Sequence, residues 1–276
     1  MAGSVAADCN SKVVKPGSTS RQSQASKTVT TFFSGALLFI LINVFSSTVV
    51  AEESAPAEQE STALKAVKPY IIKYKVMHDG DKLGTATRKL EQLSNGQWQA
   101  SMESDISYYL LSDERRETSR FEVFNGFIRP LNYQSLADTS FRSDRTLIQK
   151  FDWKAMREQG SYEDRKWNMQ LKEGLLDPLT EVLAVRENLM AQKPLQPIDI
   201  SYRGEIRHHE FKVMGEEVLK TKQGEVRTAK LQLVEKNGTR ITNFWFAIDH
   251  EMLLVQIQRI KDGEEEAKLV ATSWEL

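Results

Sequence analysis

Five dipeptides that favour tight turns punctuate this sequence after residue 70. Each pairs a residue that tolerates a positive φ with glycine, the combination that two-residue type I′ β-hairpins require. Strand-like segments flank them, and residues 70–76 alternate in the manner of a half-buried strand. The pattern predicts a mainly β fold, a meander of antiparallel hairpins. The dipeptides are Asp79-Gly80, Asn95-Gly96, Asn125-Gly126, Asn237-Gly238 and Asp262-Gly263.

One segment departs from the strand pattern. Asp177 followed by Pro178 is typical of a helix N-cap and first helical position, and Pro194 is typical of a helix end. Between them the apolar residues recur at helical spacing, as Leu179 and Leu183 do. We therefore expect an α+β arrangement, in which an antiparallel curved sheet or half-open barrel of hairpins packs against one amphipathic helix.

Residues 28–51 contain no charged side chain, and four basic residues precede them. Val49 and Ala51 are the small residues that a signal peptidase needs, so we predict that residues 1–51 are a signal peptide cleaved after Ala51. The run is also long enough for an uncleaved membrane anchor. The expected location is the periplasm, and the alternative is an inner-membrane-anchored protein that faces the periplasm.

The remainder divides into a short lead-in and one domain. Residues 52–66 are rich in Glu, Ala and Ser and predict a disordered segment, and residues 67–276 predict a single β-rich domain. The one cysteine, Cys9, lies in the predicted signal peptide, so we expect no disulfide and no thiol nucleophile. Glu52 follows the predicted cleavage site, which excludes a standard lipoprotein anchor. Acidic and basic residues are interspersed, so we expect no nucleic-acid partner.

Catalytic and metal-binding motifs are weakly represented. His208, His209 and Glu210 have metal-ligand chemistry, but on a strand His208 and Glu210 would share one face while His209 points away. We interpret them as a polar strand and predict no metal site. No nucleophile elbow, phosphate-binding glycine loop or dinucleotide motif is present, so we predict no catalytic residue and no cofactor. A carboxylate-based hydrolase that acts on envelope polymers is the enzymatic alternative.

Aromatic residues are more numerous than one small core usually needs. Phe244 and Phe246 share one face of a predicted strand, and Trp245 takes the other. One interpretation is core packing against the helix. The other is an apolar groove or open barrel interior for a lipid-like ligand, and its predicted lining is Trp153, Phe244 and Phe246 with Leu183 from the helix.

Several short motifs also resemble a known family. They are Phe121, residues 125–133, 151–153, 177–180, 244–247 and 253–255. In this order and spacing they resemble the bacterial domain of unknown function 3108 over most of residues 70–276. The resemblance implies a secreted, mostly antiparallel β protein of Gram-negative envelopes without an assigned activity. Its general look is similar to the half-open barrels of lipoprotein carriers, a likeness of fold rather than of function.

We therefore expect a non-catalytic binding or envelope-maintenance protein that takes an apolar or lipid-like ligand. The alternative is a structural interaction module that presents an exposed sheet edge to an envelope protein.

Overall fold

The computed structural model describes residues 68–108, 111–234 and 238–276. The predicted signal peptide (1–51) and lead-in (52–66) lie outside the described residues. In chain order the elements are β1 (Tyr70–His78), β2 (Asp81–Gln92), β3 (Trp98–Tyr108), β4 (Leu111–Phe124), β5 (Phe127–Thr139), β6 (Arg145–Asp152), β7 (Arg157–Tyr162), β8 (Arg165–Gln170), α1 (Pro178–Met190), β9 (Ile198–Tyr202), β10 (Glu205–His209), β11 (Phe211–Thr221), β12 (Gly224–Val234), β13 (Arg240–Ala247), β14 (Leu253–Lys261) and β15 (Glu264–Glu275).

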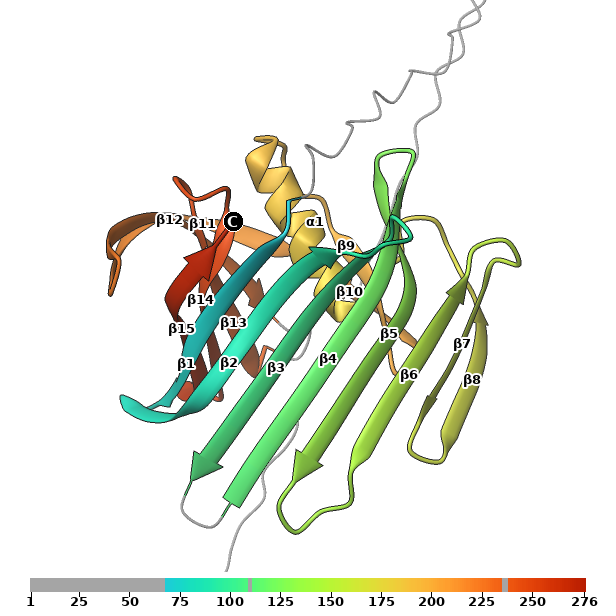
Figure 1. The fold of residues 1–276 in the computed structure, drawn as a ribbon, viewed down its shortest axis with the longest axis horizontal. Helices are drawn as coiled ribbons and strands as arrows, with labels where there is room; N and C mark the ends of the chain where they lie inside the picture. Colours follow the sequence, from blue (N-terminus) through green and yellow to red (C-terminus); the bar gives the residue numbers. More distant parts are fainter. Residues whose placement is uncertain (1–67, 109–110, 235–237) are drawn as a thin grey trace, which may run out of the picture. The chain divides into compact units, whose positions relative to one another are not determined.

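Thirteen of these strands form one antiparallel sheet in the order β11-β12-β13-β14-β15-β1-β2-β3-β4-β5-β6-β7-β8. The last and first strands of the domain, β15 and β1, pair in its middle. The two edge strands, β8 and β11, do not pair with each other, so the sheet curls without closing into a barrel (Figure 1). β9 and β10 form a separate hairpin. Over the described residues, this architecture confirms the predicted curved sheet with one helix.

Most of the predicted tight turns form as expected. Asp79 and Gly80 have φ values of 48° and 90°, and Asn125-Gly126 and Asp262-Gly263 are similar. These pairs of positive φ are the signature of type I′ turns. The Asn95-Gly96 turn differs, because residues 93–97 form a longer connection in which only Gly96 has a positive φ, of 82°. Asn237 lies outside the described residues.

The helix begins where the sequence predicts. Asp177 is its N-cap and accepts hydrogen bonds from the backbone N–H groups of Leu179 and Thr180. The Thr180 side chain accepts one in return from the Asp177 backbone at 2.9 Å, which completes a capping box. In the part of the chain that the structure describes, no helix is both long and apolar enough to cross a membrane.

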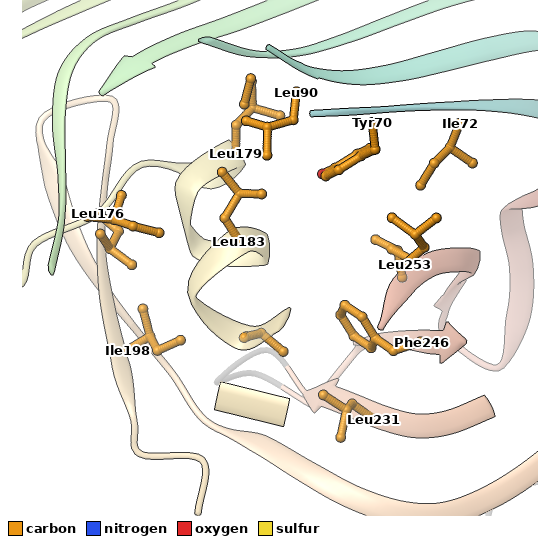
Figure 2. Packing of buried hydrophobic residues seen from close by; sticks show 14 of the residues in the cluster. Tyr70, Ile72, Leu90, Leu176, Leu179, Leu183, Ile198, Leu231, Phe246 and Leu253 are labelled. Atoms are coloured by element: carbon orange, nitrogen blue, oxygen red, sulfur yellow. The ribbon is translucent and has the colours of Figure 1, made fainter. Parts of the chain in front are cut away.

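α1 packs inside the curve of the sheet, against β3, β4, β5 and β9. Figure 2 shows Leu179 and Leu183 of α1 among apolar side chains from both halves of the sheet, including Leu90 and Phe246. The segment before the helix is tied to the β9–β10 hairpin, because Ser201 donates a backbone hydrogen bond of 2.8 Å to the carbonyl of Leu176. One apolar core therefore joins the sheet, the helix and the hairpin.

Candidate functional site

The structure places the predicted groove residues in different surroundings. Leu183 and Phe246 are only 2% and 1% exposed and belong to the core around α1. Phe244 is partly buried, and its ring centroid lies 5.6 Å from that of Phe211. Trp153 lies just after β6, where its indole N–H donates a 2.6 Å hydrogen bond to the Pro130 carbonyl. The structure thus places Leu183 and Phe246 within the core and Phe244 and Trp153 at its margin, and a groove lined by all four stays a prediction.

The two neighbouring histidines of β10 take part in separate ion pairs. The His208 imidazole contacts the Asp199 carboxylate, and Asp199 also contacts Lys172. His209 Nδ1 lies 2.5 Å from Oε1 of Glu181 on α1. Among the described residues, no group of three or more His, Cys, Asp or Glu side chains could hold a metal ion.

The outer face of β2–β5 carries an open groove of about 410 Å³. Because side chains alternate along each strand, most of its lining side chains, including Glu103, Asp105 and Glu114, point away from the core. Five of its twelve lining residues carry carboxylates, and Arg116 lies 3.2 Å from Glu103. The lining carboxylates are Glu103, Asp105, Glu114, Asp138 and Asp144.

The inner, core-facing side of the same strands carries arginines together with the Glu117 carboxylate. Register places Arg88 of β2 opposite Ile72 and Met102, on the inner side. Arg88 is 5% exposed, and its Nε and Nη1 atoms are buried without a hydrogen-bond partner in the structure. Arg115 and Arg145 follow on the same side of β4 and β6. Burying a guanidinium without an acceptor is costly, so this side of the sheet favours an anionic group.

These arginines lead to a group of stacked cations and rings beside the β9–β10 hairpin. The Arg203 guanidinium lies 3.9 Å from the centroid of the Tyr162 ring and 4.9 Å from that of Tyr202. The Arg207 guanidinium lies 4.4 Å from the Tyr202 centroid on its own hairpin. Arg145 is the diagonal neighbour of Tyr162, since Leu147 pairs with Tyr162. We call Arg145, Tyr162, Tyr202, Arg203 and Arg207 the arginine–tyrosine cluster.

The cations of this cluster are poorly neutralised. The Nε atoms of Arg145 and Arg203 are buried and form no hydrogen bond in the described structure. Neighbouring Arg115 and Arg165 face Asp113 at 2.7 Å and Glu205 at 3.6 Å, respectively. Hydrogen bonding to Asp113 raises the pKa of Arg115 further above its ordinary value. Stacked guanidinium groups with free N–H donors are suited to binding a phosphate or carboxylate.

Buried polar side chains hold the β9–β10 hairpin of the cluster against the sheet. The Gln149 amide donates hydrogen bonds of 2.8 Å to Glu158 Oε1 and to the Ser201 hydroxyl of β9. The Trp167 indole N–H also donates to Glu158 Oε1, at 2.8 Å. Gln149, Glu158 and Ser201 are fully buried, so these bonds fix the hairpin against β6–β8.

Glycines let these contacts form. A Cβ on Gly160 would lie 2.2 Å from the Trp167 indole, and a Cβ on Gly204 would lie 2.8 Å from the same ring. Gly204 also has a φ of 74° and follows Arg203, at 55°, in the tight turn between β9 and β10. The Arg203-Gly204 pair was the available sequence signal for this hairpin, since glycine in a strand or turn often marks a close approach.

The comparisons with known proteins concern family and fold. The family model described as "Protein of unknown function (DUF3108)" matches residues 70–270. No curated protein sequence matches the chain. A similar solved structure is that of a β-barrel-like protein of the domain of unknown function DUF1849 from Brucella abortus. It is 7% identical, with a TM-score of 0.53 over 75% of this chain and 97% of that chain, a likeness of fold alone.

Proposed function

The chain belongs to the DUF3108 family of proteins of unknown function, and we propose that it is an exported, non-catalytic binding protein of the Gram-negative envelope. Its ligand is lipid-like and anionic, and the anionic group binds the arginine–tyrosine cluster. The observation that carries this proposal is the close approach of the Arg203 guanidinium to the rings of both Tyr162 and Tyr202, with its Nε buried and without a hydrogen bond.

The chemistry of the cluster supports an anion with an apolar part. Guanidinium groups stacked on rings present planar donors for phosphate or carboxylate oxygens. The half-buried faces of Tyr162 and Tyr202 offer apolar area beside those donors. Arg88 and Arg145 extend the positive charge along the inner side of the sheet. A lipid with an anionic headgroup provides both properties in one molecule.

Native mass spectrometry of the protein purified under mild conditions tests this function. We expect a co-purified anionic lipid, which is lost on raising the salt concentration because the contact is electrostatic. A protein that carries only neutral lipids, or none at any salt concentration, would contradict the proposal. Apolar dye binding that competes with an anionic lipid would support it from a second direction.

Export is the second part of the proposal. Its support is the uncharged run of residues 28–51 and the small residues at Val49 and Ala51. N-terminal sequencing of protein recovered from the periplasmic fraction tests it. A mature chain that starts at Glu52 is the expected result, and a chain that retains the run in the membrane fraction would indicate an anchor.

The carboxylate-lined outer groove favours a second candidate, a hydrolase of envelope polymers. Glu114 and Asp105 face each other across β3 and β4 in that groove. Incubation of the protein with purified envelope glycans tests the idea. Product release that is abolished by Glu114→Gln would establish it, and unchanged glycans would remove it.

A further inference from the structure

The sheet has two free edges, and they differ in length and chemistry. β8 covers six residues and begins with two basic residues, Arg165 and Lys166. β11 covers eleven residues and presents exposed apolar side chains. Unpaired edge strands offer backbone N–H and C=O groups to another strand, and short or charged edges discourage that pairing. β8 is therefore the shorter edge, and β11 is the longer one and combines charged with exposed apolar side chains.

Several apolar side chains of β11 are exposed to solvent. Val213, Met214 and Val218 are 65%, 52% and 58% exposed. Gly215 interrupts the strand with a bulge, where the register with β12 shifts between Val213 and Gly215. From Glu216 to Thr221 the register is regular, so this segment is the part of the edge that can accept a further strand.

The charges of this regular segment are self-complementary. Glu216, Val218 and Lys220 alternate with their neighbours and so share one face of the strand. If two copies pair antiparallel with Val218 opposite Val218, each Glu216 faces Lys220 of the other copy. An isologous contact repeats every pair twice, so this arrangement contains two Glu–Lys pairs around a central valine pair.

We propose that a second copy of this chain pairs with β11 in this register and forms a symmetric dimer with a continuous sheet. Within each copy, Arg227 of β12 forms an ion pair with Glu216 at 3.2 Å. Opposite charges directly across paired strands stabilise the contact, and like charges destabilise it. The pairing brings together the two Val218 side chains, each of which is 58% exposed in a single copy.

Sedimentation velocity across a range of protein concentrations tests the dimer. Glu216→Lys and Lys220→Glu each place like charges opposite one another at both ends of the segment. The dissociation constant of each single variant is expected to be at least about tenfold higher than that of the wild type. An equimolar mixture of the two variants is expected to recover the wild-type dissociation constant, because opposite charges then face each other in the mixed dimer.

Matched variants keep the test specific. Arg120→Glu reverses an exposed charge on β4, outside the edge, and is expected to leave dimerisation unchanged. Far-ultraviolet circular dichroism checks that each variant is folded. A wild-type protein that stays monomeric at every concentration overturns the proposal. So does a dimer that both single variants leave intact, or an edge that pairs only with a different envelope protein.

Discussion

The carboxylate of Asp177 accepts a 2.5 Å hydrogen bond from the hydroxyl of Ser119, which ties the N-terminus of α1 to the middle of β4. The same carboxylate caps the helix through its other oxygen. Both residues are fully buried. Burial raises the pKa of Asp177 from 3.8 to about 6, although its hydrogen bonds act in the opposite direction.

The raised pKa of Asp177 makes stability depend on pH. The folded protein keeps this proton up to about pH 6, whereas the unfolded chain releases it near pH 3.8. Between these values the folded state binds more protons, so the contribution of Asp177 to the free energy of unfolding falls as pH rises. Asp177→Asn removes this dependence. Urea unfolding at several pH values is expected to show that the free energy of unfolding of the variant rises relative to that of the wild type from about pH 4 to pH 6. A difference between the two free energies that does not change with pH would contradict the pKa shift.

Leu183 separates core packing from groove lining. Its burial at 2% exposure predicts that Leu183→Ala lowers the free energy of unfolding by about 2–5 kcal/mol, because the lost side chain leaves a cavity. Val182→Ala, at the partly exposed neighbouring position, is the control and is expected to cost less. Denaturant unfolding measures both. A loss of lipid binding with unchanged stability would instead indicate that Leu183 lines an open groove.

Gly160 allows the Trp167 indole to lie against β7. Gly160→Ala places a methyl group 2.2 Å from that ring and 2.7 Å from the carbonyl of Ile148, so we expect a loss of about 1–3 kcal/mol from overpacking. The cost is expected to shrink when Trp167→Leu is also present, because the ring is then absent. A double-mutant cycle measures this coupling. Additive effects of the two changes would show that the contact does not govern stability.

The helix start and the tight turns can be predicted from the sequence because adjacent residues determine them. Asp177-Pro178 predicts the helix start because the cap and the first helical residue are adjacent in sequence. Asp79-Gly80 predicts its hairpin because both residues need a positive φ. Arg203-Gly204 also forms a tight turn, but arginine rarely takes this position, so the β9–β10 hairpin was missed.

The candidate site depends on contacts that no local pattern contains. Tyr162 ends β7 and Arg203 lies beyond the helix. They meet because tertiary contacts, such as the hydrogen bond from Gln149 to Ser201, hold the hairpin against the sheet. Periodicity likewise marks Phe246 as apolar without telling whether it faces a filled core or an open groove. In the structure it is 1% exposed, beside Leu231 and Leu253 (Figure 2).

A titration with monomeric lysophosphatidylglycerol, followed by tryptophan fluorescence, tests whether the arginine–tyrosine cluster binds an anionic lipid. We expect saturable binding that exceeds binding of lysophosphatidylcholine. It weakens at least about tenfold in the Arg203→Met, Arg207→Met double variant, since each charged contact contributes about 1.5–3 kcal/mol. Arg120→Met, at an exposed arginine outside the cluster, is expected to bind like the wild type. Equal binding of both lipids, or full binding by the double variant, would show that the cluster does not bind the anionic group.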